Sequence, residues 1–173
     1  RNGFQQLEIA FTTMLKSKAK GDALLAEVAN IAATTPFGLK DVASGTKMLL
    51  AYGTELGNVR EEIMMLGNVA SGTGQPLNDL IYLYGTLRTQ GRAYAMDIRQ
   101  FAGRGIPIYT ELAKVMGINK DQVAAFVEEG KVGFPEVEKA FKNMTKDGIG
   151  MFAGLMEAQS KSIGGNLERL GDA

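Results

Sequence analysis

The chain has 173 residues, of which 45% are hydrophobic and 22% are charged, as in an ordinary packed globular protein. Its 19 Lys and Arg residues balance its 19 Asp and Glu residues, so no net charge attracts it to nucleic acid or to anionic lipid. It contains neither cysteine nor histidine, which excludes disulfides, thiolate metal sites and every histidine-assisted nucleophile.

Apolar residues recur every three or four positions along the chain, which is the spacing of amphipathic helices. No stretch shows the sustained apolar-polar alternation of a half-buried strand. In chain order the helical stripes are Phe4, Leu7, Phe11 and Met14; Leu24, Val28 and Ile31; Leu56, Val59, Ile63 and Leu66; Leu77, Leu80, Ile81, Tyr84 and Leu87; Ile108, Leu112, Val115 and Met116; Val123, Phe126 and Val127; Val137, Ala140, Phe141 and Met144; and Phe152, Leu155, Met156, Ile163, Leu167 and Leu170. The pattern predicts an all-α protein, a compact bundle of short glycine-punctuated helices with longer helical segments at both ends.

Glycine and proline mark the expected helix boundaries. A glycine follows several periodic segments, where a left-handed residue would end a helix, and a proline precedes several others. Asn119 with Gln122 resembles a capping box at a helix start. We expect most of the 22 glycines to act as helix stops and tight corners. The boundary residues are Gly53, Gly91, Gly117, Gly130 and Gly148, and Pro36, Pro76, Pro107 and Pro135.

Three regions are expected. Residues 1–35 are predicted to form a helical arm or hairpin, residues 36–148 a central helical domain, and residues 149–173 a terminal helix, interrupted at Gly164 and Gly165, that continues into a longer parent chain. The first residues lack an initiator methionine and a signal-peptide core, and the last do not resemble a natural stop. We therefore expect a fragment of a longer protein, with a mature, processed chain as the alternative. No apolar run approaches the roughly 20 residues needed to span a bilayer.

Two short segments match S-x-x-K, the nucleophile motif of one class of serine hydrolases. They are Ser17 to Lys20 and Ser44 to Lys47. The companion S-D-N and K-T-G elements are missing, so we interpret both as ordinary helix surface.

Other patterns also have a functional and a simpler interpretation. Residues 71–76 form a glycine-rich segment before a helix, but they lack the G-K-[ST] ending of a phosphate-binding loop, which favours a turn between helices. Residues 103–105 place Arg104 between glycines, as an anion contact or as a tight turn with an ion pair. The adjacent carboxylates at 61–62 and 128–129 point about 100° apart on a helix and are interpreted as solvated surface. We predict no catalytic, cofactor-binding or metal-binding residue, and no enzyme.

The segment 112–123 has the rhythm of a helix-turn-helix. One helix would end at Gly117 and a second would begin at Asn119. The second helix, residues 120–129, carries three acids and one lysine, and acids that face phosphates weaken DNA binding. A packed helical corner is the better interpretation, and a nucleic-acid-binding module is the alternative.

Four segments, in this order, resemble the N-terminal conserved domain of phage tail tape measure proteins. They are residues 37–53, 66–74, 83–91 and 97–107, and the helix-turn-helix-like stretch and residues 144–148 continue the match. Together they cover roughly residues 36–165. Family signatures often show Asp where this chain has Asn68.

The resemblance implies a structural and assembly module of a bacteriophage or prophage tail, in a family in which polypeptide length sets tail length. It implies the tail tube protein, tail assembly chaperones and tail-tip proteins as partners, association of several copies, a place in the virion tail, and assembly in the cytoplasm of the bacterial host. A globular fragment of this size is expected to be an assembly or anchoring domain at one end of the long polypeptide that sets tail length. On this hypothesis residues 1–35 and 149–173 should carry apolar faces that the central domain does not fully cover.

Overall fold

The computed structural model describes residues 3–161, and most of them are helical. The helices are α1 (Gly3–Leu15), α2 (Lys18–Thr34), α3 (Leu39–Ala51), α4 (Val59–Thr73), α5 (Leu77–Gln90), α6 (Ala95–Gly103), α7 (Ile108–Met116), α8 (Val123–Glu128) and α9 (Phe134–Met144), with the single 3-10 turns η1 (Leu56–Asn58) before α4 and η2 (Lys120–Gln122) before α8. Within the described residues, β-pairing is limited to one isolated bridge between Arg92 and Gly133. The predicted all-α class is confirmed.

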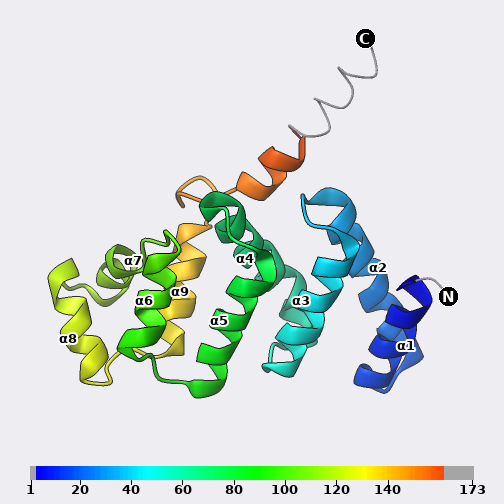
Figure 1. The fold of residues 1–173 in the computed structure, drawn as a ribbon, viewed down its shortest axis with the longest axis horizontal. Helices are drawn as coiled ribbons and strands as arrows, with labels where there is room; N and C mark the ends of the chain where they lie inside the picture. The colour runs from blue at the N-terminus through cyan, green and yellow to red at the C-terminus, as the bar shows by residue number, and fades with distance from the viewer. Residues whose placement is uncertain (1–2, 162–173) are drawn as a thin grey trace, which may run out of the picture.

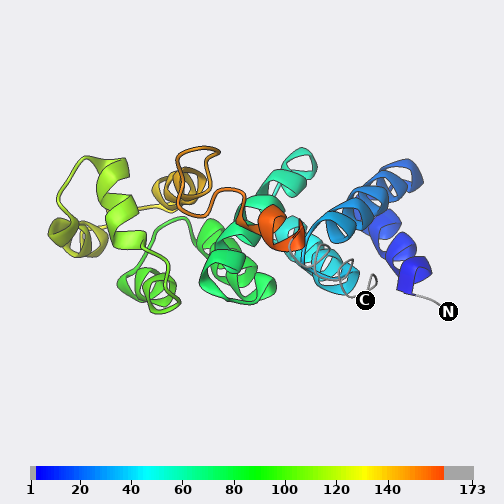
Figure 2. The ribbon, with the colours of Figure 1, turned by 90° about the horizontal axis from the view of Figure 1, so that it is seen from above.

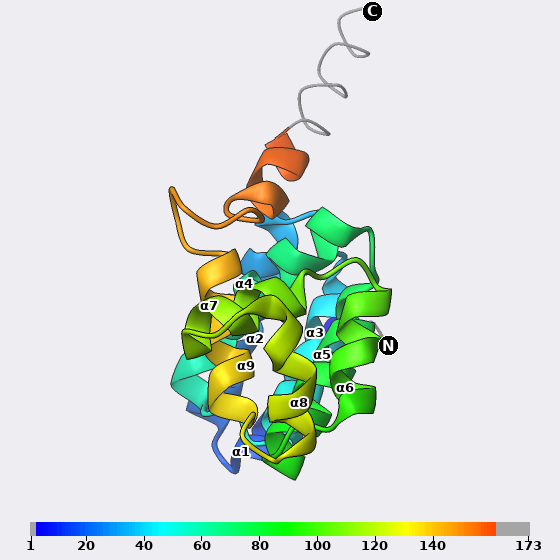
Figure 3. The same cartoon turned by 90° about the vertical axis from the view of Figure 1, so that its left-hand side faces the viewer.

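The helices stand side by side in a row (Figure 1). The pair α1 and α2 forms one end, α3, α4 and α5 form the middle, and α6 to α9 form the other end. Figure 2 shows the length of this row from above, and Figure 3 looks along it. Helix α9 packs against α4, α5 and α7, so it ties the middle of the row to its far end.

The predicted helix boundaries are confirmed at Gly53, Gly91, Gly117 and Gly130, whereas Gly148 lies in the turns after α9 ends at Met144. All five boundary glycines have positive φ, and Gly117 illustrates why: its φ of 67° is left-handed, and its N–H bonds back to the carbonyl of Ala113 to close α7. Pro76 and Pro107 immediately precede α5 and α7. The capping box is also present, because the Asn119 N–H donates to Gln122 Oε1 at 2.9 Å.

Five further glycines lie inside helices, where they are neither helix stops nor corners. A Cβ at position 45 would lie 2.6 Å from Ile81 Cδ1, so Gly45 lets α3 and α5 pack closely. A Cβ at Gly85 would meet the ring of Tyr52. Small side chains at these positions therefore set the spacing between neighbouring helices. The five are Gly21, Gly45, Gly67, Gly72 and Gly85.

The core runs the length of the row and has an aromatic centre. Tyr84 on α5 packs against Phe134 and Phe141 of α9, with ring centroids 5.0 and 5.2 Å apart. Phe101 of α6 extends the cluster, 5.2 Å from Phe141. Offset and edge-to-face contacts of this kind join α5, α6 and α9, three helices that are separated in sequence.

The C-terminal region leaves the row above α4 (Figure 1). Residues 151–154 form turns and residues 155–161 are helical, so the helix in this region begins later than residue 149. The predicted glycine interruption at 164–165 and the continuation to residue 173 lie outside the described residues. No helix in the described part of the chain is long and apolar enough to cross a membrane.

Candidate functional site

The two S-x-x-K segments occupy ordinary helical positions. Ser17 is the N-cap of α2, and its Oγ accepts a hydrogen bond of 3.1 Å from the backbone N–H of Lys20. Ser44 lies exposed on α3, one turn before Lys47, beside an open cleft of about 460 Å³ between α1 and α3. Among the described residues, no group of three acids is placed to hold a metal ion.

The two glycine-rich segments are turns. Residues 71–73 form the last turn of α4, Gly74 closes the helix with a φ of 70°, and Pro76 precedes α5. At the other segment, Arg104 Nε donates to Asp79 Oδ2 at 2.6 Å and its Nη1 donates to the carbonyl of Gln100. The interpretation of residues 103–105 as a tight turn with an ion pair is therefore the one that the structure supports.

The helix-turn-helix-like segment forms a packed corner. Its second helix consists of η2 and the six-residue α8, and Val123 and Val127 face the core. The exposed positions include Asp121, Glu128 and Glu129, against Lys120. A helix with this outer surface repels phosphates, so the structure gives no support to the nucleic-acid interpretation.

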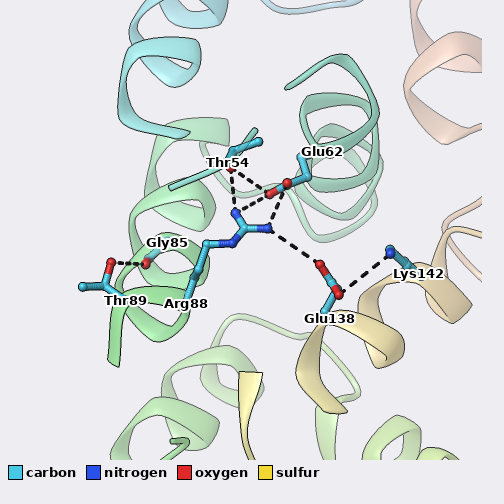
Figure 4. A network of polar contacts seen from close by, with 7 residues as sticks. All are labelled: Thr54, Glu62, Gly85, Arg88, Thr89, Glu138 and Lys142. Atoms are coloured by element: carbon cyan, nitrogen blue, oxygen red, sulfur yellow. Dashed lines mark hydrogen bonds and ion pairs between the residues drawn. The ribbon is translucent and has the colours of Figure 1, made fainter. Parts of the chain in front are cut away.

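Figure 4 shows an ion pair between Arg88 of α5 and Glu62 of α4. The two guanidinium nitrogens donate to the two carboxylate oxygens at 2.7 and 2.9 Å, and Nη1 also donates to Thr54 Oγ1 at 2.7 Å. Glu138 of α9 lies 3.7 Å from Nη2, and the guanidinium stacks 4.7 Å from the ring centroid of Phe134. One side chain of α5 thus contacts α4, α9 and the connection between α3 and α4.

Burial and charge act in opposite directions on Arg88. Burial lowers its pKa, but the hydrogen bonds and charge of Glu62 outweigh burial, so the pKa of Arg88 is raised and its guanidinium stays charged. For Tyr84 the charged form is the anion, so burial raises its pKa. The charge of Glu138 raises it further, and this phenol stays neutral. The cluster of Arg88, Glu62, Thr54 and Glu138 is therefore a structural clamp between α4, α5 and α9.

The interpretation of residues 61–62 as solvated surface is wrong for one of the two. Glu61 is exposed, but Glu62 is 7% exposed and paired. A signal was present in the sequence, because Glu62 lies three residues after Val59 and four before Leu66, on the apolar stripe of its helix. The two glutamates at 128–129 are exposed, as predicted.

A strip on α4 receives the C-terminal segment. Phe152, 4% exposed, lies over Gly72, and Met156, 1% exposed, lies over Gly67. A Cβ at position 67 would lie 2.6 Å from Met156 Sδ, and one at position 72 would meet the Phe152 ring. The absence of a side chain at Gly67 and Gly72 thus lets Met156 and Phe152 pack directly against the backbone of α4. We call residues 67–72 the docking strip and residues 152–161 the docked segment.

Asn68 of α4 caps the helix of the docked segment, although the two are 88 positions apart in the sequence. The helical bond from Ala158 N–H to the carbonyl of Gly154 makes Gly154 the N-cap, but glycine has no side chain to accept a first-turn N–H. Asn68 Oδ1 supplies the acceptor, 3.0 Å from Met156 N. Gln159 Nε2 adds a hydrogen bond of 3.2 Å to the carbonyl of Ser71. The strip thus fixes where this helix begins.

Large apolar side chains are exposed near both ends of the described chain. On α1, Phe4, Ile9 and Met14 are 45%, 63% and 42% exposed, and α1 packs mainly against α2. Near the other end, Ile149 and Met151 are 76% and 60% exposed. Uncovered apolar faces were expected in both of these regions. Exposed large apolar side chains also lie between them, at Tyr82, Tyr94 and Met96.

A family model described as Tape measure protein matches residues 1–173, the whole chain. No curated protein and no solved structure matches it. The match confirms the resemblance inferred from the four segments and extends it over every helix of the row.

Proposed function

This chain belongs to the tape measure protein family, and on that premise we propose that it is a structural and assembly module of a bacteriophage or prophage tail. The parent protein, in this proposal, determines tail length through its other parts. An aspartate at position 68, which the family pattern often has, would offer the same oxygen acceptor to Met156 that Asn68 offers.

The path of the chain is the observation that carries this proposal. It indicates that the module is distinct from the part of the parent protein whose length sets the tail length. A single straight helix of 173 residues would extend about 260 Å, because each residue adds about 1.5 Å. The described residues instead double back through helices of 6 to 17 residues that stand side by side. Length added within such a row does not add to the length of a tube.

We propose that the exposed apolar groups on α1 and at 149–151 contact other tail components. The candidates are the tail tube protein, tail assembly chaperones, tail-tip proteins and further copies of the chain. The protein would be assembled in the host cytoplasm and would reside in the virion tail. A structural role without enzymatic activity fits the Arg88 clamp, which holds helices together and lines no described cleft.

The test is tail length measured by electron microscopy after in-frame deletions in the gene of the parent protein. Removing 60 helical residues outside this module is expected to shorten tails by about 90 Å. Removing α1 and α2 is expected to reduce the number of tails without shortening them in proportion. The proposal is wrong if the first deletion leaves tail length unchanged, or if the second shortens tails by about 1.5 Å per residue. A peptidoglycan-release assay on the isolated chain, expected to be negative, tests the absence of hydrolase activity.

A further inference from the structure

We infer that the docked segment, residues 152–161, is a latch that leaves the docking strip while α1 to α9 stay folded. Four features of the described residues carry this inference: the few contacts that hold the segment, the turns that connect it to α9, the clefts beside that connection, and its capping by a residue of another helix. The inference concerns the chain's own conformations and does not depend on the proposed role in tails.

Few side chains hold the latch in place. Of the ten residues in the docked segment, Phe152 and Met156 are buried and Leu155 is partly buried against the core, whereas α4 buries eight of its 15 residues. Two polar contacts reach the strip, from Asn68 to the Met156 N–H and from Gln159 to the Ser71 carbonyl. Segments with little apolar burial open at lower free energy than core helices, so this segment should open before the rest of the row.

The connection between α9 and the latch has the features of a hinge. It lacks regular helix from Thr145 to Met151, and Gly148 has a φ of 77°, which favours glycine. Its outer side chains, Ile149 and Met151, are exposed. A short turn-rich connection can change its backbone angles without disturbing the packed helices on either side.

Open space flanks the hinge on two sides. One cleft of about 560 Å³ lies between α4 and the end of α9, and a second of about 470 Å³ lies between the start of α7 and the hinge. Asn143 and Lys146 line both clefts. The hinge therefore has open space beside it, and undocking of the latch withdraws Phe152 and Met156 from buried positions.

The capping arrangement couples docking to helix formation. The first turn of the latch helix receives its side-chain acceptor from Asn68, not from its own N-cap Gly154. When the latch leaves the strip, it loses this acceptor, and its first turn is destabilised. Docking on α4 therefore stabilises the helix, and any partner that binds the strip or the latch shifts the balance between the two states.

Amide hydrogen exchange of the 173-residue chain, read by mass spectrometry, tests the latch. Peptides from residues 152–161 are expected to exchange at least tenfold faster than those from α4. Asn68→Ala is expected to speed exchange of the latch a further fivefold or so, the effect of losing a cap, and to leave α5 and α9 unchanged. The matched control is Asn143→Ala, in the same cleft but without a side-chain hydrogen bond within residues 3–161, and it should change nothing. The inference is overturned if the latch exchanges at the rate of α4, or if Asn68→Ala speeds exchange equally in α4, α5 and the latch.

A disulfide separates undocking from fraying in place. The chain has no cysteine, and position 67 faces Met156, so Gly67→Cys with Met156→Cys places one thiol on the strip and one on the latch, and a thiol assay after oxidation verifies that they have joined. Oxidation should slow exchange of the latch to the rate of α4, and reduction should restore it. Circular dichroism of the reduced form checks that the pair folds. If the oxidised form still exchanges as fast as the wild type, the amides open without leaving the strip, and the latch is refuted.

Discussion

Replacing Arg88 by methionine tests how the centre of the row is held together. The substitution leaves the carboxylate of Glu62 in a site that is 7% exposed, without its cation. Breaking a buried pair costs about 3–5 kcal/mol. Because the side chains of Arg88 and Glu62 keep 18% and 9% of their exposure, we expect the lower end, about 3 kcal/mol. The lost stacking of the cation on Phe134 adds about 0.5–1 kcal/mol.

Urea denaturation followed by circular dichroism measures this loss. With a slope of about 2 kcal/mol per M, the midpoint should fall by about 1.5–2 M. The double variant Arg88→Met with Glu62→Leu leaves no unpaired charge and should return to within about 1 kcal/mol of the wild type. Lys18→Met is the matched control, because Lys18 pairs with Asp22 at 2.9 Å but its side chain is 70% exposed. We expect no measurable change there.

Two outcomes would refute this reasoning. If Arg88→Met costs no more than Lys18→Met, the buried pair contributes no more than a surface contact. If the double variant is as unstable as the single one, the loss comes from packing and from the Thr54 hydrogen bond and not from an uncompensated carboxylate. Sodium chloride at 1 M should not remove the difference, because buried charges are poorly screened.

Two further predictions address packing and binding. Gly85→Ala should destabilise the protein by about 1–3 kcal/mol in the same urea assay, since its Cβ meets the ring of Tyr52. Gly57→Ala, whose Cβ meets open space, should change stability by less than about 0.5 kcal/mol, and equal effects would contradict the packing argument. Fluorescence titration with duplex DNA at low salt should detect no binding, because Asp121 and Glu128 face outward from the helical corner; salt-dependent binding would restore the nucleic-acid interpretation.

Much of the local structure could be predicted. The three-to-four-residue period identified the helical class, and the glycines at 53, 91, 117 and 130 ended helices where expected, whereas Gly148 lies in the turns that follow α9. These features depend on the residue and its immediate neighbours: an apolar stripe requires one buried face, and a left-handed backbone favours glycine. The Asn119 capping box was predictable for the same reason, since its partners are three residues apart.

The site was harder to predict. Adjacent glutamates point in different directions, yet both of those at 61–62 were predicted to face solvent. The stripe shared by Glu62 with Val59 and Leu66 indicates burial, but it does not identify Arg88, 26 positions away, as the partner. The glycines inside helices were equally ambiguous. Glycine occurs both where a helix ends and where a neighbouring side chain packs against the helix backbone, and the sequence does not distinguish the two roles.

By itself, the sequence determined the helical class, the helix ends and the family of this protein. The tertiary structure alone decided the order of helices in the row, the burial of Glu62 against Arg88, and the capping of Met156 by Asn68, 88 positions earlier. The physical reason is the range of the interactions. Helix period and glycine φ are set within a few residues, whereas a buried ion pair or a distant cap forms only when packing brings remote segments into contact.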